Sequence, residues 1–478
     1  MQPISDHIHT HTDIDLHRAT SKCPLITLPP ELIDSILEYL SPLDLNHVSE
    51  TCRALYSRAT ADHLWQTLVQ ENIPGLKITS SYPCADFREL FGAHDPRWFL
   101  PKYKIWFSGR DLVGKLLLAR YDQRRGCIEA YQIVAISNHT GLQAWFADEN
   151  HTFDPRVALH VDKPVIKFAA KIDPECRRAG ELSRAQGRRF TREVPMIVDE
   201  NPDSMFCNFV LAKPMPPKDI GPRLLKRFPY GCLWPPPAIP EDERVRAPAL
   251  DDEYPHLRAD EVPDSRSEAS DHIFHIRQWI EMAPGAASNL ILGQNLMWTR
   301  RGIEVHNLSP GDGAGGSAAD NPGTTGAHLG EQIMTYSTLE PKLYNPTALK
   351  PWRGIWVGDY GGHGCEFLLI HQPDDDPPIS DERLGLKRGE DESQEDWEAR
   401  RLEKRVYRGR LEAIKLTGDP NVPRGEHTFI AEDLADDEFG RESEDSQFRG
   451  ARVVPSIGHI ARTGFQNGRS SSDGFGMT

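Results

Sequence analysis

The sequence lacks long apolar segments and paired cysteines. No run approaches the roughly 18–20 apolar residues that cross a bilayer. The N-terminal stretch MQPISDHIHTHTDIDLH has no basic region followed by an apolar one, so we expect no secretory signal. The eight cysteines are scattered without a C-x-x-C pair, which argues against a zinc ribbon or a disulfide framework. These absences favour reduced thiols and a location in the cytoplasm or the nucleus, with no membrane partner.

Positive charge is also scarce. The 478 residues include 55 Lys and Arg against 71 Asp and Glu, which gives a formal net charge of −16. Nucleic-acid surfaces need clustered Lys and Arg, so we expect no nucleic-acid partner. With 37 Gly, 38 Pro and 38% hydrophobic residues, the composition predicts a globular core interrupted by polar insertions.

The stretch LITLPPELIDSILEYLSPLDLNHVSETCRALYSRATADHLWQTLVQ has apolar residues at helical spacing. Ser41 and Pro42 break the pattern where a second helix can begin, and a last helix starts near Ala61. We expect three short helices over residues 24–73, after a disordered tail at 1–23. So small a bundle cannot bury all its apolar side chains, which implies a partner protein. The alternative is a helical cap packed on the domain that follows.

The order L-P-x-E-L-x-x-x-I-L-x-Y-L-x-x-x-D-L, then V-x-x-x-C-R-x-L-Y, then L-W, closely resembles the F-box. F-box helices dock on the adaptor Skp1 and so join a substrate receptor to a cullin-RING ubiquitin ligase. The resemblance implies an adaptor-facing surface formed by Leu28, Pro29, Leu32, Ile36, Leu40, Leu43 and Leu45.

From about Trp98 the pattern becomes strand-like, with a dozen short runs and no long helix between them. This favours an antiparallel barrel or sandwich and an α+β chain, with a barrel-like β-domain over residues 96–466. The polar or charged segments are expected to be disordered insertions, with a tail after them, at 235–272, 309–330, 373–403, 431–450 and 467–478. A short solvated helix is compatible with residues 395–405.

Three motifs mark the β-rich part: Leu349-Lys350-Pro351, G-x-x-x-G-x-Y-G-x-H-G-x-E over 354–366, and K-L-T-G-D-P-N-V-P-x-G over 415–425. Together they look like the substrate-binding domain of the F-box-only protein 31 family. The resemblance implies a barrel-like domain that captures C-terminal tails of substrates, including cyclins and, in animal members, amidated termini.

The glycine-rich stretch GIWVGDYGGHGCEFLLIH runs into a strand, which excludes a phosphate-binding loop. Its polar residues, with those of the 415–425 motif, are our candidate substrate-binding residues: Asp359, Tyr360, His363, Glu366, Lys415, Thr417 and Asp419. The alternative is that Asp359 and Asp419 cap turns through side-chain to backbone hydrogen bonds. Nothing identifies an oxyanion hole beside Cys365 and His363, so we expect no catalysis.

His7, His9, His11 and Asp13 superficially match a metal-binding pair with a further ligand. Such a site needs a buried strand, and MQPIS is too short to form one, so we predict no metal and no cofactor. The sequence thus predicts a non-catalytic substrate-recognition subunit of an SCF E3 ubiquitin ligase, which binds Skp1 and directs protein substrates to ubiquitination and proteasomal degradation. The alternative is a small-ligand-binding β-barrel whose F-box serves its own turnover.

Overall fold

The computed structural model of the chain describes most of its residues, over these ranges: 24–109, 113–136, 155–171, 189–190, 192–196, 204–224, 233–247, 257–280, 295–299, 302–306, 330–359, 364–374, 380–419, 422–435, 441–443, 449–462, 466–471 and 475–476. The predicted tail at 1–23 and nearly all of the predicted insertion at 309–330 lie outside them.

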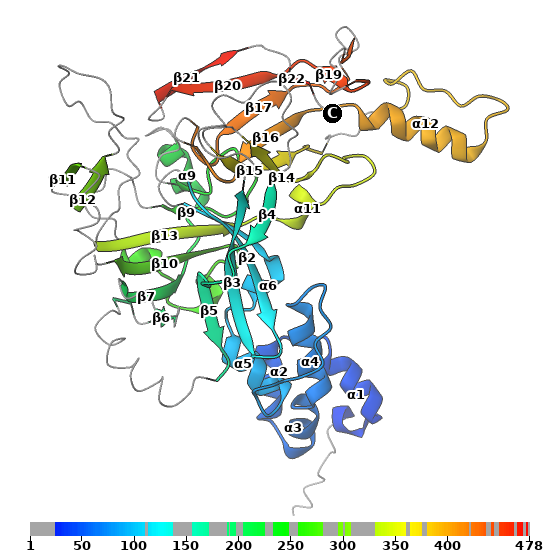
Figure 1. Cartoon of the computed structure of the whole chain (residues 1–478). Helices are drawn as coiled ribbons and strands as arrows, with labels where there is room; N and C mark the ends of the chain where they lie inside the picture. The colour runs from blue at the N-terminus through cyan, green and yellow to red at the C-terminus, as the bar shows by residue number, and fades with distance from the viewer. Residues whose placement is uncertain are drawn as a thin grey trace, which may run out of the picture.

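Short helices form the N-terminal region, which lies at one end of the molecule (Figure 1). They follow in the order η1 Pro24–Thr27, α1 Pro30–Leu37, α2 Pro42–Ser49, α3 Arg53–Ala59, α4 Asp62–Glu71, α5 Phe87–His94 and α6 Phe99–Tyr103. Residues 24–73 therefore hold four α-helices and not the three that we expected. Cys52 is the reason, because its extended backbone (φ −159°, ψ 162°) ends one helical segment and starts another.

The larger sheet has nine antiparallel strands. Its order is β4 Arg156–Leu159, β3 Cys127–Ile136, β2 Leu116–Asp122, β1 Ile105–Ser108, β13 Gly330–Thr338, β10 Ile273–Ile280, β7 Ser204–Leu211 and β6 Val194–Pro195, with β5 Ile166–Ala169 also paired to β3. The two middle strands, β1 and β13, come from segments that are far apart in the sequence.

The second sheet has six antiparallel strands and includes the C-terminal part of the chain. Its order is β14 Gly354–Asp359, β15 Cys365–His371, β16 Leu411–Lys415, β17 His427–Ala431, β20 Ile457–Arg462 and β21 Gln466–Ser471. Smaller pairings join β8 Leu233–Trp234 to β9 Val245–Arg246, β11 Asn295–Thr299 to β12 Gly302–His306, and β19 Arg452–Val454 to both β18 Arg441–Glu442 and β22 Phe475–Gly476. The remaining helical elements are α9 Pro217–Leu224, η2 Ala259–Glu261, η3 Arg266–Glu268, α11 Pro341–Tyr344 and α12 Gln394–Val406.

The strands that the structure describes form no closed barrel, which corrects our barrel expectation. Both large sheets run in an open order with two ends each. Alternating apolar and polar residues are equally compatible with a barrel and with stacked open sheets, because closure depends on pairing between distant strands. None of the described helices has the length and apolarity to cross a membrane.

Two cores lie on opposite faces of the larger sheet. Trp106 and Phe107 are consecutive in β1 and are both fully buried, one in each core. The core around Trp106 continues into the helical region through Trp98 and Trp65. The core around Phe107 includes Phe367 and neighbouring apolar residues of the six-stranded sheet. The helices and both sheets are therefore held together by burial of apolar surface.

The described parts of the predicted insertion at 235–272 are ordered into the core, so that prediction was wrong. Ile239, Val245, Leu257 and Val262 are all buried. The segment has few apolar residues, but several of those in its described parts pack against the sheets. The average composition of the segment, which is Pro-rich and acidic, does not reveal that a few of its apolar residues are buried.

The other predicted insertions differ among themselves. Helix α12 lies where we allowed a solvated helix, and none of its residues is buried. Within 431–450, Ala431, Leu434 and Ala435 are buried. The predicted tail at 467–478 contributes to β21 and to β22, because backbone pairing needs no apolar side chain.

Candidate functional site

Helices α1 and α2, with the turn before α1, leave large apolar side chains in solvent. We call these residues the apolar stripe: Leu28, Leu32, Ile36, Tyr39 and Leu43. Leu32 is 51% exposed, Leu43 64% and Tyr39 90%. So many exposed apolar side chains on two adjacent short helices indicate a surface that another protein covers.

The stripe is presented by a helix whose other face is anchored. Ile33 and Leu37 of α1 are buried, whereas Leu32 and Ile36 are exposed. The Arg58 guanidinium lies 3.0 Å from the Asp34 carboxylate and joins α3 to α1. Alternate burial on an amphipathic helix thus fixes which leucines remain outside.

The seven residues predicted to face the adaptor do not all lie on this surface. Leu28, Leu32, Ile36 and Leu43 are exposed, as is Pro29. Leu40 is only partly exposed, and Leu45 is 1% exposed and belongs to the core. Leu45 therefore contributes to the surface only by supporting it, which corrects its predicted role. The sequence pattern could not separate the two cases, because α2 is short and apolar on more than one side.

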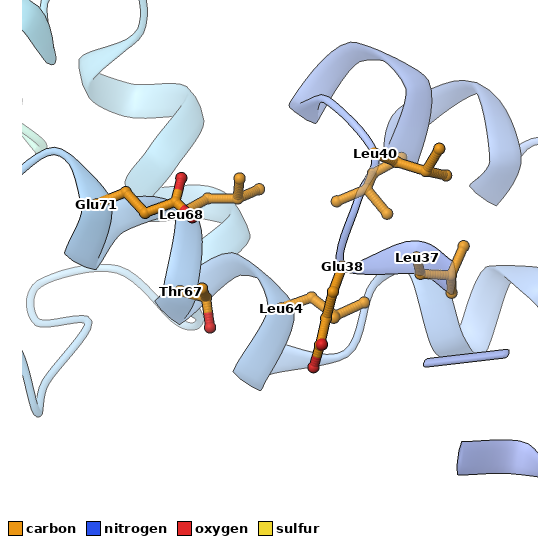
Figure 2. Close-up of a pocket in the computed structure, with 8 residues that line it drawn as sticks. Leu37, Glu38, Leu40, Leu64, Thr67, Leu68 and Glu71 are labelled. Carbon is orange, nitrogen blue, oxygen red and sulfur yellow. The ribbon is translucent and has the colours of Figure 1, made fainter. Parts of the chain in front are cut away.

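A small cavity lies behind the stripe, between α1 and α4 (Figure 2). Leu64 and Leu68 of α4 point across it toward Glu38 and Leu40 (Figure 2). Its volume of about 20 Å³ is that of roughly one water molecule. It is a packing gap and not a site for an organic ligand.

The second candidate site is a buried group of charges in the six-stranded sheet, formed by Glu366, Lys415 and Asp419. We call it the charged triad. The Lys415 Nζ atom lies 2.5 Å from Glu366 Oε2 and 2.6 Å from Asp419 Oδ2. Lys415 is 1% exposed, Glu366 2% and Asp419 7%. Three of the seven predicted substrate-binding residues are thus brought together.

Strand register explains how the triad forms. Lys415 lies opposite Leu368 in the β15–β16 pair, so Glu366 is the next residue along β15 on the same face. Asp419 comes from the loop that follows β16, and its Oδ1 atom accepts a hydrogen bond from the Val422 N–H at 2.5 Å. The turn-capping alternative is therefore correct for Asp419, which holds a turn as well as an ammonium group.

One ammonium group faces two carboxyl groups, and the protonation of Glu366 adjusts to this. Burial raises the pKa of Glu366 to about 8; Asp419 adds to the rise and Lys415 opposes it. The Lys415–Asp419 contact is also a hydrogen bond, whereas the Lys415–Glu366 contact lacks hydrogen-bond geometry. A protonated Glu366 at neutral pH leaves the triad without net charge.

The loop after β16 also fastens the six-stranded sheet to the larger one. The Thr417 Oγ1 atom accepts a hydrogen bond from the Phe367 N–H at 2.9 Å. The Arg424 Nε atom donates to the Ser108 carbonyl at 3.0 Å, and its guanidinium lies 4.8 Å from the centre of the Trp234 ring. Gly425 has φ +81°, and a Cβ there would lie 2.2 Å from Pro236, so the loop requires glycine at this point.

The structure describes the other predicted binding residues of the glycine-rich stretch only in part. Asp359 ends β14 opposite Cys365, and its side chain is outside the described set, as are Tyr360 and His363 altogether. Sequence reasoning overlooked Trp356, which is 48% exposed on β14. The signal for it was present, since a tryptophan between two glycines in a strand has no side-chain neighbours on its own strand to cover it.

The described residues contain no group of three His, Cys, Asp or Glu side chains placed to hold a metal ion. His7, His9, His11 and Asp13 lie outside those residues, so the expectation that they hold no metal stays a prediction.

Comparisons with known proteins bear on both sites. Residues 25–71, which cover α1 to α4, match the family described as F-box-like. Residues 336–474, which cover the six-stranded sheet and the charged triad, match the family described as the cyclin D1 binding domain. The chain is also similar to Protein EXECUTER 2, chloroplastic, of Arabidopsis thaliana, with 32% identity over 105 residues. That similarity spans 22% of this chain and 14% of the relative's length. The apolar stripe thus lies in the segment that matches the F-box-like family, and the charged triad in the segment that matches the cyclin D1 binding domain.

Proposed function

We propose that this protein is the substrate-recognition subunit of an SCF-type E3 ubiquitin ligase. The apolar stripe carries the proposal, because an F-box-like domain with exposed Leu32, Ile36 and Leu43 presents the surface that a Skp1-type adaptor would cover. The β-rich region would hold the substrate. Its continuous core with the helices supports this role, since a rigid link positions a bound protein relative to the adaptor.

The mechanism is proximity and not chemistry by this chain. A bound substrate is held near a ubiquitin-charged enzyme, which raises the effective concentration of its lysines. The match to a cyclin D1 binding domain supports cyclin-like substrates. The finer proposal is that the turn over 358–366, supported by the buried charged triad, forms part of a site for a substrate's C-terminal tail, as in the F-box-only protein 31 family. We further propose the cytoplasm or the nucleus as the location.

The alternative of a small-ligand-binding barrel receives no support from the described residues. Their strands enclose no lumen, and the cavity beside the apolar stripe is too small for an organic ligand.

The test replaces two exposed leucines of the stripe, Leu32→Asp together with Leu43→Asp. Both side chains are exposed in the free chain, so folding should persist, whereas burying two carboxylates against an apolar adaptor is costly. We expect Skp1 affinity to fall by about 100-fold or more, measured by calorimetry. The matched control is Leu349→Asp with Leu402→Asp, two leucines that are also exposed but lie far along the chain.

A second arm measures ubiquitination of a D-type cyclin by the reconstituted ligase, with and without the cyclin's C-terminal tail. We expect transfer to depend on this chain and on an intact apolar stripe, and to drop when the tail is removed. A folded stripe variant that retains wild-type Skp1 affinity would disprove the adaptor role. Equal ubiquitin transfer to the cyclin with and without its C-terminal tail would disprove only the tail site.

A further inference from the structure

Ser41 lies along the chain between two members of the apolar stripe, in the connection from α1 to α2 that residues 38–41 form. One of these members is Tyr39, which is 90% exposed, and the other is Leu43, which is 64% exposed. Ser41 is itself exposed, and its backbone is extended, with φ −65° and ψ 158°. The hydroxyl group is therefore open to an enzyme, and an adaptor that covers both Tyr39 and Leu43 also covers Ser41.

Pro42 follows Ser41 directly, and a Ser-Pro dipeptide is the sequence that proline-directed protein kinases require. Kinases bind the acceptor residue in an extended conformation. Ser41 already has this conformation, because a following proline restricts the residue before it to the extended region. The whole chain contains one other Ser-Pro, Ser309-Pro310, and no Thr-Pro, and Ser309 lies outside the described residues. Ser41 thus combines the required sequence with the required conformation and exposure.

A phosphate group at this position would meet no positive charge from the stripe. Residues 28–52 contain five Asp and Glu residues and no Lys or Arg. Two basic side chains from α3 and α5 contact these helices, and both already have partners. Arg58 pairs with Asp34 at 3.0 Å, and Arg88 donates to the Asn46 side chain at 2.9 Å. A phosphate carries a charge of about −2 near neutral pH, and its burial under an apolar partner without a counter-charge is costly.

Helix α2 can remain folded when Ser41 carries a phosphate. The Ser41 Oγ atom accepts a hydrogen bond from the Asp44 N–H at 3.2 Å, and a phosphate oxygen can accept from the same group. Negative charge is favourable at the N-terminus of a helix. The Asp44 carboxylate, which accepts from the Ser41 hydroxyl at 2.6 Å, would be repelled, but this side chain is exposed and can turn into solvent. Phosphorylation should therefore change association and not folding.

We propose that Ser41 is a phosphorylation site for a proline-directed protein kinase, and that its phosphorylation prevents adaptor binding. In the transfer, Ser41 Oγ forms a bond to the γ-phosphorus of ATP while the bond from that phosphorus to the leaving oxygen of ADP breaks, and the hydroxyl proton passes to the base of the kinase. The proposal rests on the proposed function, because the stripe must be the adaptor surface. It adds regulation: the kinase acts on the free chain, and a bound adaptor shields Ser41.

The experiment treats the purified full chain with ATP and an active mitogen-activated protein kinase, which needs little beyond a Ser-Pro dipeptide. Mass spectrometry identifies the phosphorylated residues, and calorimetry measures Skp1 affinity before and after treatment. We expect phosphate on Ser41 and a Skp1 affinity that is lower by at least about 100-fold. When Skp1 is added before the kinase, phosphorylation of Ser41 should slow in proportion to the fraction of the chain that is bound.

Two controls separate Ser41 from other acceptors. Ser41→Asn removes the hydroxyl but retains a residue type that caps helices well, so kinase treatment should not change the Skp1 affinity of this variant. The variant still contains Ser309, so an effect of phosphate at that residue is tested in the same sample. Ser35 is exposed on α1 but is followed by Ile36 and not by proline, so it should stay unmodified.

The outcomes separate the steps. An untreated chain that does not bind Skp1 would disprove the proposed function and this regulation with it. A chain that binds Skp1 but stays unmodified at Ser41 would overturn the kinase site alone. Unchanged Skp1 affinity after phosphorylation of Ser41 would overturn the blocking effect. Lost affinity accompanied by lost helical circular dichroism would overturn it as well, because the phosphate would then act by unfolding α2.

Discussion

The helical region and the six-stranded sheet depart in opposite ways from the rule that apolar side chains are buried and charged side chains are exposed. The helices leave Leu32 and Leu43 in water, whereas the sheet buries Glu366, Lys415 and Asp419. The free energy falls when a partner covers exposed apolar groups, so the apolar stripe is stabilised only when it is bound. Buried charges must be satisfied within the fold, so the charged triad is complete in the free chain.

Substitutions should therefore have different effects in the two regions. Substitutions in the stripe should change association and leave folding intact, because those side chains contribute little to the core. Substitutions in the triad should change folding first, because any charge left behind cannot reach water. The three predictions below test this contrast, from the largest expected effect to the smallest.

Lys415→Met should lower the free energy of unfolding by about 3–5 kcal/mol, because it leaves Asp419 buried beside Glu366 without a counter-charge. Urea denaturation of the Skp1-free chain measures the loss. The matched control is Lys404→Met on the exposed side of α12, which should be nearly neutral. Equal stability of the two variants would show that the triad is not a buried charge network.

His94 tests whether the helices and the larger sheet unfold as one unit, because it lies in α5 and its Nε2 atom is 3.1 Å from the Gly126 carbonyl between β2 and β3. Burial, with Arg97 nearby, lowers the pKa of His94 to about 3. Between about pH 6.5 and pH 3 only the unfolded state takes up this proton, so the stability due to His94 is present above pH 6.5 and falls as pH is lowered.

His94→Gln should therefore abolish about 2 kcal/mol of the stability loss between pH 7 and pH 5. Denaturation at both pH values, followed by tryptophan fluorescence and by circular dichroism, measures it. The glutamine can still donate to the Gly126 carbonyl, which limits the loss of packing. An unchanged pH dependence would contradict the buried neutral imidazole, and separate transitions for the two probes would contradict a single cooperative unit.

Ser41→Ala should have the smallest effect. Ser41 caps α2, where its Oγ atom accepts a hydrogen bond from the Asp44 N–H at 3.2 Å. Loss of such a cap costs about 1 kcal/mol, and fraying of α2 should weaken Skp1 binding through Leu43. Ser57→Ala, an exposed change within α3, is the control and should lie within about 0.5 kcal/mol of wild type. A cap variant as stable as Ser57→Ala would show that tertiary contacts alone hold α2 in place.

The helical region was the most predictable part of the molecule. Its 3.6-residue periodicity, Ser41 cap and F-box pattern located the helices and named four of the exposed residues of the stripe. The pattern did not show that Cys52 divides a helix or that Leu45 is buried, because both depend on how α2 and α3 pack against their neighbours.

The sheet region was predictable in kind and not in arrangement. The motifs at 354–366 and 415–425 identified Glu366, Lys415 and Asp419 as residues that belong together, but not that they are buried as an ionic group. The segment at 235–272 was judged by its average composition, whereas its structure is decided by a few anchors such as Ile239 and Leu257.

The sequence by itself determined the two classes of element, because hydrophobic periodicity and capping residues act over a few neighbouring positions. Tertiary structure alone decided which strand edges stay open, which leucines face solvent and which charges meet in the core. These features depend on pairing between segments hundreds of residues apart, such as Arg424 with Ser108 or β1 with β13. Local patterns carry no information about such contacts, because the free energy that selects them is released only when the surfaces meet.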